Sequence, residues 1–481
     1  MPIYNRIDGE WCPSSDEATV TSHDPAAPDT VVGELQQSTV ADTERAIASA
    51  QSAQTTWANT PGPERGAYLR ATAGRLESRS ESLAELLSQE EGKTLSEAMG
   101  EVQRAIDIFY YYAEKAADLG GTIKASSSEA TTLSVRKAPV GVVAAITPWN
   151  YPIAIPAWKI APALAAGNTV VLKPATNTGC IAQALVECLV ESGLPEGTIN
   201  FVTGRGSVVG EVLATDERID AISFTGSEGV GDVVYQNAAP NQTRVQLEMG
   251  GKNPTVVMDD ADIEQAAEIV AAGAFGVTGQ ACTACSRAIV HEDSYDAFVE
   301  TLTSKAQALT LGPGVDDPDM GPQSSASELE GTLEYIDIGT DEGATLETGG
   351  GVPTDDALDA GYFIEPTVFS DVDPEMRIAQ EEIFGPVVAV IPVSDFEEAI
   401  DVTNGVEQGL AASIVTESLT HANRFVDETE AGVIKVNEKT TGLELHVPFG
   451  GMKGSSNELY REQGDAGLEF YTTSKTVYMN Y

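Results

Sequence analysis

Two short segments carry residue types that could perform covalent catalysis. Cys282 stands in segment 279–283, among Gly and Ala residues, where a thiolate could attack a carbonyl carbon. Glu248 precedes Gly250 and Gly251, a glycine pair that lets the backbone come close to a ligand. A cysteine nucleophile with a carboxylate base is therefore the first hypothesis for this chain.

A third polar side chain lies in segment 147–152, which reads Thr-Pro-Trp-Asn-Tyr-Pro. The two prolines hold the backbone and present the amide of Asn150 at the end of a predicted strand. An amide N–H fixed in this way stabilises an oxyanion, an effect worth about 3–4 kcal/mol. The alternative interpretation is a structural turn asparagine.

Cys282 and Cys285 also form a Cys-x-x-Cys pair, which is typical of a redox dithiol or of half a zinc site. The context does not resemble a small thioredoxin-like domain. No ligand spacing occurs among the four histidines, which are His23, His291, His421 and His446. We predict no metal site and interpret Cys285 as a bystander.

Several turns that follow predicted strands could bind phosphate or ribose. Segment 203–210 contains Gly206 and resembles a dinucleotide fingerprint with one extra residue, but an ordinary Gly-rich turn fits it equally well. Gly226 and Ser227 close the next strand, where amides and a hydroxyl could meet a phosphate at a helix N-terminus. Lys173 ends an earlier strand and could reach the same ligand, although a solvated loop lysine is the alternative.

The elements that position these residues follow from periodicity and turn residues. We expect a β-like start over 3–11, two helices within 41–91 broken at 60–63, and a helix over 94–118. Beyond them strands alternate with helical crossovers, which indicates a parallel, doubly wound sheet that binds ligands beyond the carboxyl ends of its strands. The expected strands are 140–146, 169–173, 198–202 and 220–224, and the expected helices are 155–166, 179–192 and 208–214.

A second α/β stretch is expected over 256–436, with strands at 287–290, 387–391 and 432–436. The aromatic segment 468–473 predicts a final strand. Such a tail either forms an edge strand of its own subunit or pairs with a partner subunit.

Length and charge restrict the function classes. A chain of 481 residues predicts two or three domains. Its 74 Asp and Glu against 27 Lys and Arg give a net charge of −47, which excludes nucleic acid and anionic membranes as partners. Because the acidic residues are scattered, we predict a solvated acidic shell adapted to a high-salt cytoplasm; a merely acidic mesophilic protein is the alternative.

The remaining composition predicts a soluble cytoplasmic protein. No segment approaches the roughly 20 apolar residues of a membrane span, and the first residues do not resemble a signal peptide. The five cysteines, an odd number, suit reduced thiols.

Seven motifs together resemble the aldehyde dehydrogenase superfamily in order and spacing, over essentially the whole chain. Met249 stands where Leu is commoner in that family. The motifs occupy segments 148–152, 173–175, 224–227, 248–252, 279–282, 381–386 and 448–451.

The resemblance implies a role for each matching residue. Cys282 would attack the aldehyde to give a thiohemiacetal, and Asn150 with the Cys282 N–H would hold the oxyanion. After hydride transfer to a nicotinamide, Glu248 would activate the water that hydrolyses the thioester. The implied cofactor-binding residues are Trp149, Lys173, Thr176, Gly206, Gly226, Ser227, Met249, Glu382 and Phe384.

Position 176 bears on the cofactor. Members of the family that are strict for NAD often have a glutamate there, which repels a 2′-phosphate. Thr176 is uncharged and Lys173 is near in sequence, so we predict that NADP is preferred and that NAD is also used.

The fold implied by the resemblance is α/β with three parts, an aldehyde dehydrogenase fold. The expected division is a Rossmann-like parallel-sheet cofactor domain (1–120 and 138–250), an α/β catalytic domain (251–436) and a small β oligomerisation element (121–137 and 437–481). A dimer or a tetramer is expected.

The resemblance implies that the substrate is a small aldehyde and that Tyr151, Ile155 and Trp158 line its pocket. Succinate-semialdehyde dehydrogenases commonly have an arginine where Trp158 stands. Segments 436–451 and 461–464 look like a subgroup that acts on 2-oxoglutarate semialdehyde (2,5-dioxopentanoate) at the end of oxidative pentose and sugar-acid degradation. The alternatives are a dehydrogenase of succinate semialdehyde, betaine aldehyde or glyceraldehyde, and a non-catalytic protein on the same fold.

Overall fold

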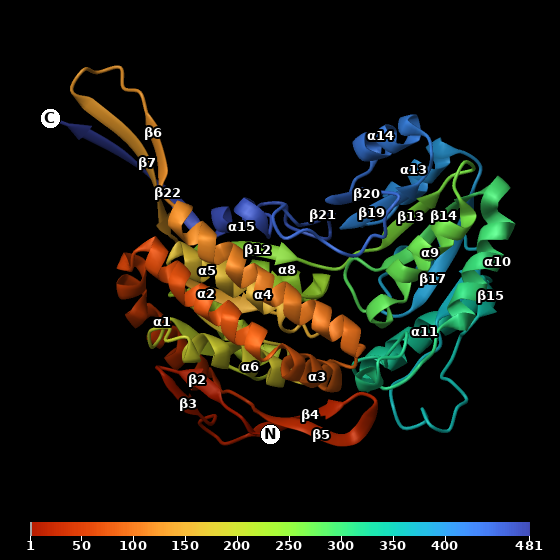
Figure 1. The fold of residues 1–481 in the computed structure, drawn as a ribbon, viewed down its shortest axis with the longest axis horizontal. Helices are drawn as coiled ribbons and strands as arrows, with labels where there is room; N and C mark the ends of the chain where they lie inside the picture. Colours follow the sequence, from red (N-terminus) through yellow and green to blue (C-terminus); the bar gives the residue numbers. More distant parts are fainter. Residues whose placement is uncertain (1) are drawn as a thin grey trace.

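The computed structural model describes residues 2–481. Two seven-stranded sheets form two α/β lobes that lie side by side, and a β arm projects from the first lobe with the C-terminus at its tip (Figure 1). The predicted α/β class is confirmed.

The sheet of the first lobe has the strand order β12-β11-β8-β9-β10-β2-β3. Its first five strands run parallel, and every residue of β8 and β9 is buried because helices cover both faces. Two antiparallel strands, β2 (Asn5–Ile7) and β3 (Glu10–Cys12), complete one edge. The parallel strands are β8 (Val142–Ile146), β9 (Thr169–Lys173), β10 (Ile199–Phe201), β11 (Ala221–Thr225) and β12 (Arg244–Glu248).

The helices of the first lobe include one break, at Arg79, that the sequence analysis did not expect. The region 41–91 holds three helices instead of two, because Arg79 leaves helical geometry with φ −113° and ψ 8°. A π-helical turn, Gly206–Gly210, precedes the short α7. The helices are α1 (Val40–Asn59), α2 (Gly62–Ser78), α3 (Ser80–Glu91), α4 (Leu95–Asp118), α5 (Ala154–Ala166), α6 (Gly179–Glu191), α7 (Glu211–Thr215) and α8 (Glu228–Ala238).

The second lobe contains the sheet β15-β16-β17-β14-β13-β19-β20, which is parallel except for β15. The chain enters it through residues 249–252, between β12 and β13. Its strands are β13 (Asn253–Val257), β14 (Cys285–His291), β15 (Thr345–Thr348), β16 (Thr367–Ser370), β17 (Val387–Val393), β19 (Ala411–Val415) and β20 (Val433–Val436). Its helices are α9 (Ile263–Ala274), α10 (Glu292–Ala308), α11 (Ala326–Glu342), α12 (Arg377–Gln380), α13 (Phe396–Asn404) and α14 (Leu419–Glu428).

The projecting arm is a separate antiparallel sheet with the order β22-β7-β6. It joins β6 (Gly121–Lys124) and β7 (Thr131–Pro139) to β22 (Thr472–Asn480), so the C-terminal tail pairs within its own chain. The expectation of a strand from residue 468 was wrong over 468–470. These residues belong to helix α15 (Gly464–Phe470), whose Leu468 and Phe470 are buried in the core of the first lobe.

Smaller strands complete the molecule, and apart from Ile3 of β1, which lies in the expected β-like start, the sequence patterns did not predict them. The sheet β1-β5-β4 consists of β1 (Pro2–Ile3), β4 (Thr19–Asp24) and β5 (Ala27–Gln36). A two-stranded pair joins β18 (Gln408–Gly409) to β21 (Met452–Lys453). Within residues 2–481, no helix is both long enough and apolar enough to span a membrane.

A buried ion pair joins the α3–α4 junction to the loop after β8. The Lys93 ammonium lies 2.6 Å from Glu101 Oε2 and donates to the Asn150 carbonyl at 2.7 Å. The other Glu101 oxygen accepts the amides of Ile153 and Ala154, at the start of α5, at 3.0 and 3.1 Å. One carboxylate and one ammonium therefore fix this loop and the first turn of the following helix.

We expect Lys93→Met to lower the free energy of unfolding by about 3–5 kcal/mol, because it leaves the Glu101 charge buried without a partner. Denaturant unfolding in molar KCl measures the loss. The matched control is Lys305→Met, which removes an ammonium that pairs with the exposed carboxylates of Glu264 and Glu268 and should cost much less. Equal losses in the two variants would contradict this assignment.

Candidate active site

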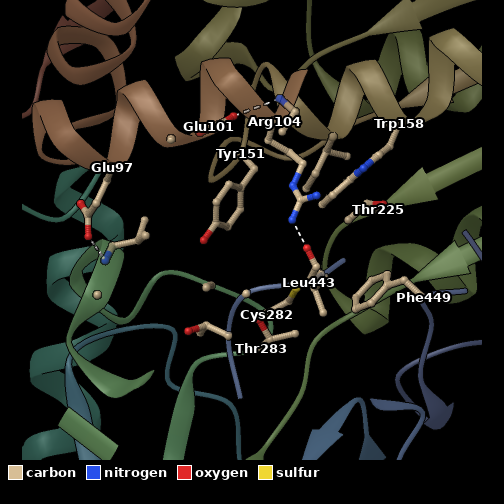
Figure 2. A pocket seen from close by; sticks show the side chains of 18 of the residues that line it. Glu97, Glu101, Arg104, Tyr151, Trp158, Thr225, Cys282, Thr283, Leu443 and Phe449 are labelled. Atoms are coloured by element: carbon tan, nitrogen blue, oxygen red, sulfur yellow. Dashed lines mark hydrogen bonds between the residues drawn. The ribbon is translucent and has the colours of Figure 1, made fainter. Parts of the chain in front are cut away.

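Two cavities meet at Cys282. The first, of about 320 Å³, lies beneath α4 and α5, and Tyr151, Trp158, Cys282 and Phe449 line it (Figure 2). The second, of about 220 Å³, lies among the loops that follow β8, β11 and β12, and Cys282 lines it as well. Cys282 is half-buried and borders both cavities. Two different reactants could therefore reach its thiol, one from each cavity.

The backbone before Cys282 is held in an unusual conformation. Val277 and Thr278 have φ values of 52° and 55°, which L-residues rarely adopt. At Gly279, with φ 69°, a Cβ atom would lie 2.2 Å from the Gly385 carbonyl oxygen, so only glycine fits. The Cys282 carbonyl then accepts a hydrogen bond from Asn253 Nδ2 at 2.8 Å. These constraints fix the thiol at the amino end of β14.

The electrostatic surroundings keep the thiol protonated. Burial, together with the negative charges of Glu382, Glu248 and Glu462, raises the pKa of Cys282 to about 12. Because the thiolate is the nucleophile, chemistry at Cys282 requires a base to take its proton.

Glu248 ends β12 and is buried at the junction of the lobes. Neither of its carboxylate oxygens has a hydrogen-bond partner within the described part of the chain. Burial and the charge of Glu462 raise the pKa of Glu248 well above its ordinary value. A buried carboxyl group with unused oxygens that lines the first cavity suits a proton acceptor for a thiol or a water.

The side chain of Asn150 lies against the same loop. Its Nδ2 donates to the Gln280 carbonyl at 2.8 Å, which leaves its second amide hydrogen free of that bond. Asn150 and Cys282 both line the second cavity. The structure therefore brings together the three residues Cys282, Glu248 and Asn150 that the sequence indicated.

The sequence analysis missed an ionisable pair next to Glu248. Lys159, on α5, lies 2.5 Å from Glu462 Oε1 and 2.9 Å from Ser223 Oγ. Lys159 is the only charged residue of α5, whose other members are apolar, and that pattern was the available signal. The charges of this pair act on Glu248 in opposite directions, since Glu462 raises its pKa and Lys159 lowers it.

The second cavity has the features of a nicotinamide site. The rings of Trp149 and Phe384 meet edge to face, with centroids 5.4 Å apart. Glu382 accepts the Gly251 amide at 3.1 Å, and a Cβ on Gly250 would lie 2.0 Å from Glu382 Oε2, so a side chain at position 250 would displace this carboxylate. The cavity is also lined by Gly226, Ser227 and Met249.

The remaining expected cofactor residues lie near the same sheet edge but outside the lining of that cavity. Lys173 ends β9; burial lowers its pKa to about 8, and its ammonium donates to the Pro174 carbonyl at 3.0 Å. Thr176 is half-buried and Gly206 is exposed, after β9 and β10 respectively. Ser227 stands before α8 without capping it, which leaves the first amides of that helix available to a phosphate.

The three expected substrate residues, Tyr151, Ile155 and Trp158, all line the first cavity. The Lys93 ammonium lies 4.3 Å from the centre of the Tyr151 ring and holds it by a cation–π contact. Leu443, from the segment 436–451 that resembles the substrate subgroup, also lines this cavity, as does Arg104, which the sequence analysis did not name.

Outside the site, Cys285 is buried on β14 and its thiol donates to Thr255 Oγ1 at 3.2 Å. Asp259, His291 and Asp293 gather at the surface. His291 Nδ1 accepts the Asp293 amide at 3.2 Å and so caps α10, which explains its position without a metal.

The sequence matches the aldehyde dehydrogenase family over residues 11–477. The chain belongs to this family. It is 60% identical over 480 residues to an alpha-ketoglutarate semialdehyde dehydrogenase of the halophile Haloferax volcanii, covering 100% of this chain and 99% of that protein. Identity is 46% to an alpha-ketoglutaric semialdehyde dehydrogenase of Bacillus subtilis, with 99% and 97% coverage.

A solved betaine aldehyde dehydrogenase of Staphylococcus aureus in complex with NAD+ superimposes with a TM-score of 0.96 at 38% identity, covering 99% of this chain and 95% of that one. The expected aldehyde dehydrogenase fold and the expected class of enzyme, an oxidoreductase acting on an aldehyde, are confirmed. This result disfavours the alternative of a non-catalytic protein.

We expect alkylation of Cys282 by iodoacetamide to accelerate about tenfold per pH unit from pH 6 to 10, because a thiol whose pKa lies near 12 gains thiolate throughout that range. Mass spectrometry of the cofactor-free enzyme in molar KCl measures modification at Cys282 alone. Cys282→Ser supplies the background. A rate that levels off below pH 8 would show that the surroundings lower this pKa instead of raising it.

Proposed function

We propose that this aldehyde dehydrogenase oxidises 2-oxoglutarate semialdehyde to 2-oxoglutarate, as the last oxidation in pentose and sugar-acid degradation. The observation that supports this substrate best is the 60% identity over the full chain to a protein named for it. A 2,5-dioxopentanoate dehydrogenase of Saccharolobus solfataricus, 43% identical, has a name for the same compound.

The proposed chemistry begins at the junction of the cavities. Cys282 Sγ attacks the aldehyde carbon while Glu248 takes the thiol proton, and a C–S bond replaces the C=O π bond. The amide of Asn150 and the Cys282 N–H stabilise the oxyanion of the thiohemiacetal.

A bound NAD(P) supplies the acceptor for the hydride that leaves this carbon, so the aldehyde is oxidised to a thioester on Cys282. Glu248 then takes a proton from a water whose oxygen attacks the thioester. The C–S bond breaks, the carboxylate leaves, and Cys282 regains its proton. Glu248 must release the proton of the thiol before it takes the proton of the water.

The residues around the second cavity fit an NAD(P) molecule. We assign the pyrophosphate to Gly226, Ser227 and the unused amides of α8. The ribose hydroxyls are assigned to Lys173 and Glu382. The nicotinamide ring is assigned to the position beside Phe384, Trp149 and Met249. Gly206 lies on the adenosine side. We further propose that NADP is preferred over NAD, because Thr176 carries no negative charge.

The division into domains is also our proposal. The crossing from the first lobe to the second at 249–252 supports a cofactor domain (1–120 and 138–250) and a catalytic domain (251–436). For the oligomerisation element (121–137 and 437–481) the support comes from its β6, β7 and β22 strands, which form the arm on which Ile123, Tyr478 and Tyr481 are 81%, 72% and 82% exposed. Apolar side chains on a projecting sheet suit self-association to a dimer or a tetramer. The five free thiols support a cytoplasmic location.

Kinetics with an aldehyde panel tests the substrate. In molar KCl with NADP, kcat/KM for 2-oxoglutarate semialdehyde should exceed the values for succinate semialdehyde, betaine aldehyde and glyceraldehyde by about tenfold or more. Equal or reversed values would cancel the substrate and leave the class of reaction intact. Cys282→Ser, which should be inactive on every member of the panel, controls for contaminating activity.

The cofactor proposal predicts that Thr176→Glu raises KM for NADP by about tenfold or more, with little change for NAD, because a carboxylate repels the 2′-phosphate. Thr176→Gln is the matched control, with the same size and no charge. If the two variants shift KM for NADP equally, size and not charge at this position decides the cofactor.

A further inference from the structure

One arginine in the first cavity has no role in the chemistry above. Arg104 extends from α4 between Tyr151 and Trp158 toward Leu443, above Cys282 (Figure 2). Its Nη2 donates to the Leu443 carbonyl. A guanidinium has five N–H donors, so this bond uses only part of the hydrogen-bonding capacity of a side chain that lines the cavity.

Three of the four acidic side chains that line the same cavity are bound to other groups, and the fourth, Glu248, forms no ion pair with Arg104. Glu101 pairs with Lys93 and accepts two amides at the start of α5. Glu97 accepts the amides of Thr94 and Val277. Glu462 pairs with Lys159. Among residues 2–481, Arg104 therefore has no carboxylate partner.

Arg104 places a cation in the cavity of a chain that has 74 acidic and only 27 basic residues. The surrounding net charge of −47 repels an anionic substrate, so a local cation is needed to retain one. The other lining side chains near Arg104 are mostly apolar, and an ion pair in such surroundings is much stronger than in water.

We propose that Arg104 is a specificity residue that binds the carboxylate at the far end of the substrate while the aldehyde carbon lies at Cys282. This inference rests on the proposed function, because 2-oxoglutarate semialdehyde carries one carboxylate, opposite its aldehyde. The planar fork of the guanidinium matches a carboxylate in a bidentate manner. Succinate-semialdehyde dehydrogenases commonly have an arginine where Trp158 stands on α5. If Arg104 on α4 binds the carboxylate, no arginine is needed at position 158.

A second cation, Lys439, lines the same cavity but is exposed. Salt screens an exposed ammonium far more than a half-buried guanidinium, and molar KCl reduces the range of its field to about 3 Å. Lys439 therefore attracts the anion weakly and makes a suitable control.

The test compares aldehydes of equal chain length with and without a carboxylate, namely 2-oxoglutarate semialdehyde, glutarate semialdehyde and pentanal. With the full-length enzyme in molar KCl, Arg104→Met should raise KM for both carboxylated aldehydes by about tenfold to a hundredfold, with a small change in kcat. KM for pentanal should stay constant or fall. Arg104→Lys, which keeps the charge and loses the fork, should show an intermediate loss, and Lys439→Met less than about threefold.

Two further comparisons separate carboxylate binding from a structural role. Arg104→Gln keeps a donor for the Leu443 carbonyl without the charge, and it should lose as much as Arg104→Met. An equal change on pentanal and the carboxylated aldehydes, or an unchanged KM for all three, overturns the role of Arg104. A wild-type enzyme that prefers pentanal overturns the proposed substrate itself, whereas a preference for the carboxylated aldehydes that survives in the variants overturns only this inference.

Discussion

The ion pair of Lys93 with Glu101 holds the reaction site in place. Burial alone lowers the pKa of Lys93, but the charges of Glu101 and Glu91 outweigh that effect and hold it above its ordinary value. The ammonium fixes the carbonyl of Asn150, and the carboxylate satisfies the first amides of α5. The proposed oxyanion donor and the substrate wall on α5 therefore depend on two charges that are stable only together.

The second constraint is the way the lobes face each other. The carboxyl ends of β8, β11 and β12 point toward the amino ends of β13, β14 and β17, and the linker 249–252 connects them directly. This arrangement crowds buried carboxyl groups around one thiol, which raises the pKa of both kinds of group. The raised pKa makes the carboxylate of Glu248 a stronger base toward the nearby thiol, while most of the chain's negative charge stays in the solvated shell.

Sequence patterns predicted the strands of the first lobe well where every residue of the strand is buried. Residues 169–173 form β9 as expected, because a short apolar run between two helices has no other stable place than a central parallel strand. The break at Arg79 was missed because neither Pro nor Gly marks it. Residues 468–470 were taken for a strand from their aromatic character, but they are helical because Leu468 and Phe470 pack into the core of the first lobe, and tertiary packing overrides β-propensity.

The sequence by itself determined which side chains we assign to the chemistry. Cys282, Glu248, Asn150 and the glycines beside them follow strand ends or tight turns, and local residue order is enough to reveal such positions. Only the tertiary structure decided the contacts between distant segments. Arg104 meets Leu443 across 339 residues and Lys159 meets Glu462 across 303, while β7 pairs with the C-terminal β22. No local pattern encodes these pairs, because each forms only when the packed lobes bring two unrelated segments to the same cavity or the same sheet.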